Sequence, residues 1–278
     1  MRTLIINLGA AGDVIRTTAI LNILEGEIHW LTSDKNAILI QNLHGLAKCI
    51  SWSEKNVLKN ISYDLVINLE DSSDTAGLLQ NIKYKELFGA YLDSSNRLTY
   101  TESSKEWFDM SLISNFANEK TDELRFKNRK SYQEIILNGL GYAFKGEKYF
   151  LPKPIKTNLT GDIAIAPKAG STWQMKNWAY YNEQKITLEE NGYRVNYLPI
   201  RQSLIEHIAD IQNHHYLISG DSLPMHIALG SEIKCLTIFI CTSPWEIYDY
   251  GIQKIITAVM HHCIVMTGFV LFNSFNVH

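Results

Sequence analysis

The sequence predicts an α/β protein made of two Rossmann-like domains, and three observations support this class. Apolar strand-like runs alternate with helix-like runs along most of the 278 residues, which is typical of parallel sheets covered by helices. A polar segment with two prolines interrupts this alternation at 151–158. Two strand-like runs end in short glycine-containing turns that lead directly into a helix, as in folds that bind ligands at the carboxyl ends of strands.

The first domain is expected at residues 1–150, where apolar runs indicate buried strands and apolar spacing of three to four indicates helices. The expected strands are Leu4–Leu8, Glu27–Leu31, Leu65–Leu69 and Glu86–Ala90. The expected helices are Val14–Leu24, Ala37–Leu43, Thr75–Asn81, Glu106–Asn115 and Tyr132–Leu140.

The second domain is expected at residues 151–278, and it opens with the Pro-containing segment as an interdomain linker because prolines cannot lie inside a helix. The expected strands are Asp162–Ala166, Arg194–Leu198, Tyr216–Ser219 and Cys235–Ile240. The expected helices are Tyr180–Glu190, Leu204–Ile211 and Pro224–Leu229.

Composition excludes several classes of protein. An apolar content of 46% and a charged content of 20% describe a globular chain, and a net charge of −3 offers no general attraction to nucleic acid. The late apolar stretch at 264–272 is too short to span a bilayer, which takes about 20 residues. The cysteines are Cys49, Cys235, Cys241 and Cys263. Because their spacing does not match that of metal-binding cysteines, we expect buried thiols in a reducing cytoplasm.

The N-terminal strand is followed by a small-residue loop that ends at Asp13. Gly9 and Gly12 would let the backbone turn tightly and approach a ligand. The loop lacks the third glycine of a dinucleotide fingerprint, because position 14 is Val. Asp34 does lie where a ribose-binding acid would, so a dehydrogenase stays open on this segment alone.

A second strand-to-helix turn lies at Gly220–Leu223. A helix that starts here would point free N–H groups and its positive dipole end at an anion such as phosphate. Ser222 suits either a helix cap or a phosphate donor. His226, one turn into the helix, suits either ligand contact or the core. A capped helix that binds nothing is the alternative.

Three stretches, in order, resemble glycosyltransferase family 9, the ADP-heptose:lipopolysaccharide heptosyltransferases. They are Leu8–Val14 with Thr17-Thr18, Ile163–Ser171 with Lys176-Asn177-Trp178, and Ser219–Ala228 with Thr242–Trp245. The resemblance covers roughly residues 1–250 and implies a GT-B architecture, two Rossmann-like domains facing across a cleft. The chain departs from the family after Gly251, where relatives carry a longer tail.

The resemblance implies that the C-terminal domain binds the nucleotide sugar. Lys168 and Lys176 are expected at the diphosphate, with the turn residues Gly220, Asp221, Ser222 and Leu223 and with His226 nearby. Solvated surface lysines are the alternative for the first two, and Asp221 could instead satisfy amides within its own turn. The nearest carboxylate pair, Asp71 and Asp74, has the wrong spacing for a metal-binding Asp-X-Asp, so no metal and no other cofactor is expected.

The resemblance assigns the N-terminal domain to the acceptor and Asp13 to the role of general base. The alternative for Asp13 is a cap of the following helix, because Asp is among the best N-cap residues. Gly9 and Gly12 would shape the loop, and Arg97 would meet an acceptor phosphate or carboxylate unless it is an ordinary surface arginine.

The expected function is therefore an inverting, metal-independent transfer of heptose from ADP-heptose to a hydroxyl of a bacterial surface glycan. The expected location is the cytoplasm, with peripheral contact at the inner membrane where the acceptor is membrane-attached. Two alternatives stay open: a nucleotide-sugar epimerase of the same fold, and a non-catalytic nucleotide-binding protein.

Overall fold

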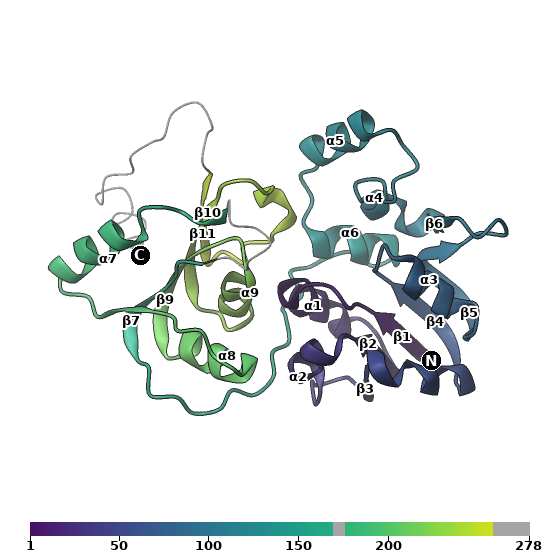
Figure 1. The fold of residues 1–278 in the computed structure, drawn as a ribbon, viewed down its shortest axis with the longest axis horizontal. Helices are drawn as coiled ribbons and strands as arrows, with labels where there is room; N and C mark the ends of the chain where they lie inside the picture. The colour runs from purple at the N-terminus through teal and green to yellow at the C-terminus, as the bar shows by residue number, and fades with distance from the viewer. Residues whose placement is uncertain (169–175, 258–278) are drawn as a thin grey trace. The chain divides into compact units, whose positions relative to one another are not determined.

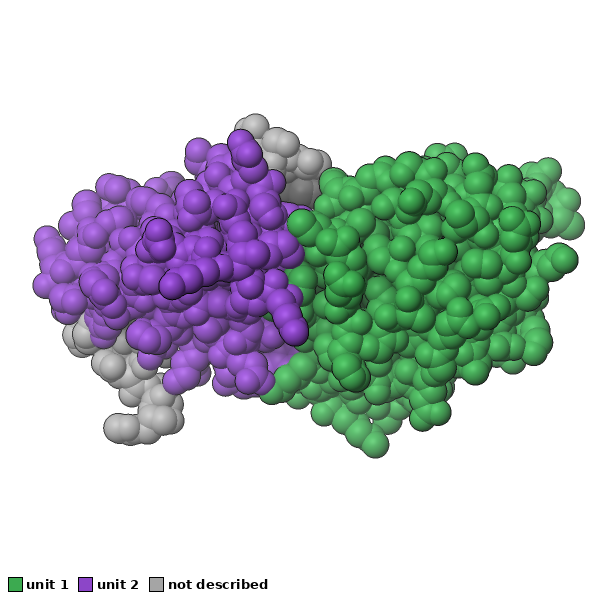
Figure 2. Space-filling view, turned by 90° about the horizontal axis from the view of Figure 1, so that it is seen from below, with its two compact units in different colours: residues 1–152, 245–248 green, residues 153–244, 249–278 purple. Residues whose placement is uncertain are grey.

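A computed structural model describes residues 1–168 and 176–257, and the chain forms two compact units (Figures 1 and 2). Unit 1 comprises Met1–Pro152 and Trp245–Tyr248, and unit 2 comprises Lys153–Pro244 and the described residues from Asp249. The segment Trp245–Tyr248 therefore belongs to unit 1 although it follows most of unit 2 in the sequence.

Unit 1 is built on a six-stranded sheet of order β3-β2-β1-β4-β5-β6, in which only β6 is antiparallel. Its strands are β1 Arg2–Ile6, β2 Glu27–Thr32, β3 Lys48–Ser51, β4 Ser62–Asn68, β5 Lys83–Leu92 and β6 Leu98–Tyr100. Its α-helices are α1 Ala11–Thr17, α2 Ala37–Ile40, α3 Ser73–Leu79, α4 Lys105–Phe108, α5 Asn118–Lys127 and α6 Tyr132–Gly139. Its 3₁₀ helices are η1 Thr18–Asn22, η2 Asp34–Asn36, η3 Trp52–Asn60 and η4 Glu102–Ser104.

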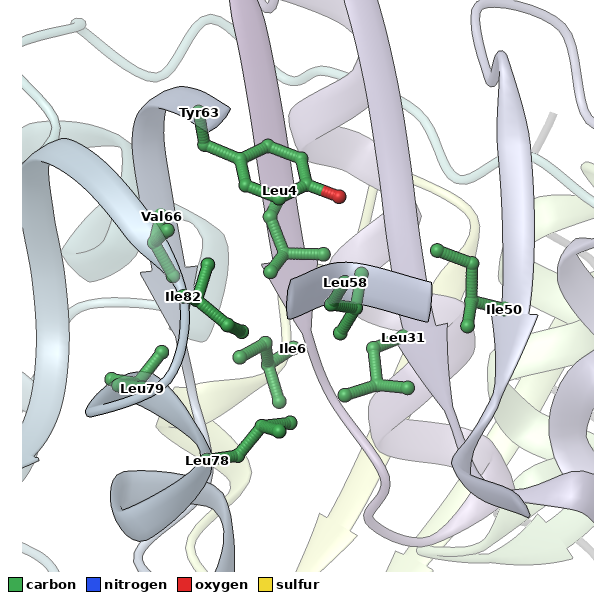
Figure 3. Close-up of a cluster of buried hydrophobic side chains, with 10 residues drawn as sticks. All are labelled: Leu4, Ile6, Leu31, Ile50, Leu58, Tyr63, Val66, Leu78, Leu79 and Ile82. Atoms are coloured by element: carbon green, nitrogen blue, oxygen red, sulfur yellow. The ribbon is translucent and has the colours of Figure 1, made fainter. Parts of the chain in front are cut away.

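Both faces of the central strands are buried, as expected for a parallel sheet. On one face, Leu4 and Ile6 of β1 pack with Leu58 of η3 and with Leu78 and Leu79 of α3 (Figure 3). Ile5 points to the opposite face and is also fully buried. This two-sided burial fixes the central strands, and with them the loops at their carboxyl ends.

The strand-and-helix alternation predicted for unit 1 is confirmed, but several boundaries were wrong. The first helix begins at Ala11, three residues before the expected Val14, and continues as 3₁₀ helix from Thr18. The helix expected at Glu106–Asn115 ends at Phe108, where the hydroxyl of Ser111 donates to the Phe108 carbonyl and closes a turn. Strands β3 and β6 and helix α5 were not predicted.

Unit 2 contains a parallel five-stranded sheet of order β11-β10-β9-β7-β8. Its strands are β7 Gly161–Ala166, β8 Val195–Tyr197, β9 His214–Gly220, β10 Lys234–Phe239 and β11 Gln253–Thr257. Its helices are α7 Tyr181–Glu190, α8 Leu204–Gln212 and α9 Leu223–Gly230. The 3₁₀ helix η6 Pro244–Glu246 begins at the last residue before Trp245–Tyr248, the returning segment of unit 1, and lies mostly within that segment.

Every strand and helix predicted for unit 2 is present within a few residues, and β11 is an addition. Several predicted features lie outside the described residues: the turn at 169–171, Cys263, the apolar stretch at 264–272 and the chain end after 257. Within residues 1–168 and 176–257, no helix is long and apolar enough to cross a bilayer.

Candidate functional site

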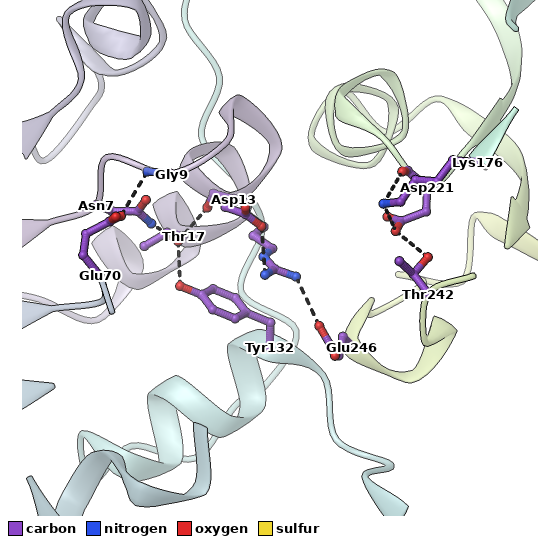
Figure 4. Close-up of polar contacts among 11 residues, drawn as sticks. Asn7, Gly9, Asp13, Thr17, Glu70, Tyr132, Lys176, Asp221, Thr242 and Glu246 are labelled. Carbon is purple, nitrogen blue, oxygen red and sulfur yellow. Dashed lines mark hydrogen bonds and ion pairs between the residues drawn. The ribbon is translucent and has the colours of Figure 1, made fainter. Parts of the chain in front are cut away.

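The strand order of unit 1 brings two loops together at the carboxyl ends of β1 and β4. The chain turns in opposite directions from these neighbouring strands, which is where open α/β sheets bind ligands. Glu70, just after β4, accepts a hydrogen bond from the N–H group of Leu8 (2.6 Å), just after β1. It accepts a second from the N–H group of Gly9 (3.0 Å; Figure 4). Burial raises the pKa of the Glu70 carboxyl, although these two bonds favour its charged form.

A polar cavity of about 180 Å³ opens at these two loops. Its lining combines carboxyl, guanidinium and amide groups with aromatic rings. Its lining residues are Asn7, Gly9, Asp13, Arg16, Leu69, Glu70, Asp71, Trp107, Phe108, Ser111 and Tyr132.

Asp13 and Arg16, which both line this cavity, form an ion pair. The Asp13 Oδ1 atom lies 2.8 Å from Nη2 of Arg16, one helical turn along α1, and the Asp13 side chain is 44% exposed. The Asp13 backbone carbonyl accepts a bond from the Thr17 hydroxyl (2.7 Å), which in turn contacts the Tyr132 hydroxyl (2.8 Å). These contacts hold a half-exposed carboxylate in a defined place at the cavity.

Arg16 is a buried cation held on several sides. Its side chain is 10% exposed, and its guanidinium lies 4.1 Å from the Tyr132 ring centre and 5.7 Å from that of Trp107. Glu246 of the returning segment lies 3.8 Å from Nη1. Burial opposes the charge of Arg16, but Asp13, Tyr132 and Glu246 outweigh it and raise its pKa.

The structure corrects the capping alternative for Asp13. Ala10 is the N-cap of α1 and Asp13 lies inside the first turn, where its negative charge suits the helix dipole without capping it. Neither Gly9 nor Gly12 has a positive φ, so neither backbone conformation requires glycine, and their role in a tight turn that approaches a ligand stays a prediction. A Cβ atom at Gly9 would meet only ordinary contacts, the nearest at 3.6 Å.

Arg97 is not brought to this cavity. It lies in the turn between β5 and β6, where its side chain is 80% exposed and pairs with Asp93 at 2.9 Å. Asp93 also accepts a bond from the Arg97 backbone N–H, so Arg97 closes its own turn. Its expected contact with an acceptor has no support from this position.

In unit 2 the corresponding loops follow β7 and β9, which are neighbours in the sheet. Lys168 follows β7 and is exposed. Lys176, later in the same connection, lies 2.8 Å from Oδ2 of Asp221 and donates to the Asp221 carbonyl at 3.0 Å (Figure 4). The Thr242 hydroxyl donates to the same carboxylate at 2.7 Å.

The pair of Lys176 and Asp221 is largely buried, with each side chain 15% exposed. Burial alone would raise the pKa of Asp221, but the hydrogen bond and positive charge of Lys176 outweigh it, and the pKa falls below its ordinary value. Lys176 is therefore not a solvated surface lysine, and it is already held by a carboxylate.

The turn before α9 has the predicted form. Ser222 is the N-cap residue, but its side chain caps no helix N–H; its hydroxyl lies 3.4 Å from the Gly220 carbonyl. A Cβ atom at Gly220 would lie 3.2 Å from the Lys176 carbonyl oxygen, so glycine permits this close approach. Leu223 begins α9, and His226 is buried at 5% exposure.

A cavity of about 500 Å³ lies beside Lys168 and the start of α9. Most of its wall is apolar. Its lining residues are Ala166, Pro167, Lys168, Tyr197, Leu198, Pro199, Ile200, Arg201, Leu204, His207, Leu223 and Pro224. Arg201 is fixed there by two bonds to the buried Asp210 (2.6 and 3.0 Å), and burial lowers the pKa of His207.

Sequence reasoning missed Arg16, Glu70 and Arg201. Glu70 and Arg201 both follow strands, Leu65–Leu69 and Arg194–Leu198, and the rule that selected Asp13 would have found them. Arg16 could not be found by this rule, because it lies inside a predicted amphipathic helix, where a single polar residue does not indicate a site. Within residues 1–168 and 176–257, no group of three or more His, Cys, Asp or Glu side chains could hold a metal ion.

Comparisons with known proteins find similarity in structure alone. No family model matches the chain, and no curated protein matches it in sequence. The E. coli heptosyltransferase WaaC with ADP matches with a TM-score of 0.67 at 15% identity, covering 99% of this chain and 98% of that one.

Two further solved structures agree. The glycosyl transferase family 9 protein from Veillonella parvula matches with a TM-score of 0.66 at 16% identity, covering 92% of this chain and 86% of that one. The E. coli ADP-heptose lps heptosyltransferase II matches with a TM-score of 0.61 at 12% identity, covering 99% of this chain and 98% of that one. The predicted α/β class and the resemblance to family 9 are confirmed at the level of fold: the chain has the GT-B fold of the heptosyltransferases.

Proposed function

We propose that this protein is an inverting, metal-independent glycosyltransferase that moves a heptose from ADP-heptose to a hydroxyl of a bacterial surface glycan, such as the lipopolysaccharide core. One observation carries the proposal. In a fold that matches heptosyltransferases over nearly its whole length, a half-exposed carboxylate, Asp13, lines a polar cavity at the carboxyl end of β1.

Unit 2 is the proposed donor-binding unit. Its cavity of about 500 Å³ has apolar walls suited to a nucleoside. Lys168 and the start of α9 lie beside it, and a cation with helix N–H groups suits a diphosphate. Lys176 and Asp221 support this turn through their ion pair.

Unit 1 is the proposed acceptor-binding unit, and Asp13 is the proposed base. The Asp13 carboxylate takes the proton of the acceptor hydroxyl as that oxygen forms a bond to the anomeric carbon of the heptose. The bond from this carbon to the diphosphate oxygen breaks, and ADP leaves with the electron pair. Attack opposite the leaving group inverts the anomeric centre.

The proposed location is the cytoplasm, at the inner face of the inner membrane where the acceptor is membrane-attached. The three cysteines within the described residues, Cys49, Cys235 and Cys241, are unbridged. Free thiols suit a reducing compartment.

ADP is expected to raise the melting temperature in the presence of EDTA, because Lys168 and helix N–H groups supply the positive charge. At an ADP concentration of about 100 times Kd, the stabilisation is about 2.7 kcal/mol. Differential scanning fluorimetry with ADP, GDP and UDP measures it. A shift that occurs only after Mg²⁺ is added would contradict metal independence.

Replacing Lys168 by alanine is expected to weaken ADP binding by about 1.5–3 kcal/mol through loss of a charge-assisted hydrogen bond. The melting temperature of the free protein should stay unchanged, because Lys168 is exposed. Calorimetric titration measures the affinity. Lys234→Ala is the matched control, since Lys234 is an exposed lysine at the amino end of β10; equal affinities in the two variants would remove Lys168 from the donor site.

A further inference from the structure

The residues that line the cavity of unit 1 carry more negative than positive charge. Three carboxyl groups line it, from Asp13, Glu70 and Asp71, against the single guanidinium of Arg16. Arg16 already lies beside two carboxylates, Asp13 at 2.8 Å and Glu246 at 3.8 Å. Its positive charge is therefore largely compensated before any ligand arrives.

Arg16 also keeps one buried donor without a partner among the described residues. The residue is 8% exposed, and within the described part of the chain its buried Nε–H group has no hydrogen-bond partner. A buried donor without a partner costs free energy. Because its charge is already paired with Asp13 and Glu246, Arg16 gives this cavity little attraction for an anionic ligand.

Glu70 offers the complementary kind of atom. Both backbone bonds, from Leu8 and Gly9, go to its Oε1 atom, which leaves Oε2 as an acceptor at the cavity. Asp71 lies at the exposed rim beside it. Carboxylate oxygens accept hydrogen bonds from hydroxyl or ammonium groups and repel other anions.

Aromatic side chains also line this cavity. Trp107 and Tyr132 meet edge to face, with ring centres 4.9 Å apart, and both line the cavity together with Phe108. A volume of about 180 Å³ holds about six water molecules, which suits a single sugar ring. Ring C–H groups would pack on the aromatic rings while hydroxyls face the carboxylates.

We propose that this cavity selects the accepting sugar by charge: the ring that enters it is neutral or amine-bearing, and a sugar acid or sugar phosphate is rejected. The proposal rests on the proposed function, because it names the acceptor class for the same site. A different cavity of unit 1 is lined by Lys105, Lys127, Arg129 and Lys130, and its three lysines pair with Glu102, Glu123 and Glu106.

Ligand-detected NMR on the full chain tests the selection without any transfer reaction. Three methyl glycosides of one ring geometry serve as probes: methyl β-D-glucopyranoside, its 2-amino-2-deoxy analogue and its uronic acid. The neutral and amine-bearing probes are expected to bind at least about tenfold more tightly than the uronic acid. A uronic acid that binds as tightly as the neutral probe would overturn the proposal.

A double variant assigns the selection to this cavity. Glu70→Gln combined with Asp71→Asn keeps the side-chain shapes, and the amide carbonyl introduced at position 70 can still accept the two backbone bonds. The difference between the uronic acid and the neutral probe is expected to shrink to about twofold or less. Glu25→Gln, a change at an exposed glutamate away from the cavity, should leave it unchanged; an unchanged difference in the double variant would place the sugars elsewhere.

The outcomes separate this proposal from the proposed function. If heptose transfer occurs but the uronic acid binds best, the charge selection is wrong and the glycosyltransferase proposal stands. If ADP binds and none of the three glycosides does, the cavity is not an acceptor site. If neither ADP nor any glycoside binds, both proposals fall together.

Discussion

Replacing Asp13 by asparagine is expected to lower the rate of heptose transfer by about 10²–10⁴-fold, the usual contribution of a positioned general base. Asparagine has the same shape and can still accept a bond from Arg16, but it cannot take a proton. Asp13 does not cap α1, so the variant loses no helix cap. Its affinity for ADP is expected to stay near that of the wild type, and its melting temperature is expected to fall modestly, because the buried Arg16 loses one carboxylate partner and keeps Glu246.

A matched control is Asp74→Asn, because Asp74 lies in the first turn of α3 as Asp13 lies in the first turn of α1. It does not line the cavity of unit 1, and its rate should stay near wild type. Near-normal transfer by the Asp13 variant would place the base elsewhere. Joint loss of stability and ADP affinity would instead make Asp13 an organiser of its loop.

Replacing Lys176 by methionine is expected to lower the free energy of unfolding by about 3–5 kcal/mol. The change leaves the Asp221 carboxylate buried without this cation, while the Thr242 hydroxyl still donates to it. Urea unfolding measures the loss. The double variant Lys176→Met with Asp221→Asn should recover part of it, because the buried carboxylate is then replaced by a neutral amide.

Full stability in the Lys176 single variant would mean that water compensates Asp221 and that the pair is not structural. Recovery in the double variant without recovered ADP affinity would separate the two roles of Lys176. The structural role is to neutralise Asp221, and the proposed functional role is to support the donor turn.

The same pair predicts a pH dependence of stability. The pKa of Asp221 in the folded protein lies below its ordinary value, so the unfolded chain binds the proton more readily. The stabilisation is therefore fully present above about pH 4, the ordinary range of an aspartate, and is lost as the pH falls through the lower folded pKa. Urea unfolding between pH 7 and pH 3 should show a smaller loss in the double variant than in the wild type, because other carboxyl groups with lowered pKa, such as those of Glu27 and Asp162, titrate in both proteins.

The strands were predictable because burial on both faces leaves long apolar runs in the sequence, as at Leu4–Ile6 and Ile163–Ala166. The start of α1 was not, because Ala10 offers no capping side chain. The early end of α4 could not be predicted, because the apolar residues between Trp107 and Ile113, interrupted by Asp109 and Ser111, suit a longer helix equally well. Strand β3 has only Ile50 buried, too little for an apolar signal.

For the candidate site, the sequence predicted which loops lie there but not which side chains pair with one another. Gly220–Leu223 was predicted from local turn chemistry, since a strand, a glycine and a helix start are all local features. The ion pair of Lys176 with Asp221 joins residues 45 positions apart, and only strand order brings them together. Arg16 acquires its role from Tyr132 and Glu246, which are distant in sequence and unpredictable from α1.

Heptose transfer itself can be measured directly. The protein is incubated with ADP-heptose, EDTA and a truncated lipopolysaccharide whose terminal core sugar is neutral, and both ADP and heptosylated product are quantified by mass spectrometry, with Asp13→Asn as the control. We expect equal amounts of ADP and product from the wild type and almost none from the variant. Bound but unconsumed ADP-heptose would indicate a binding protein, and an epimerised donor without ADP release would indicate an epimerase; either result would contradict the glycosyltransferase assignment.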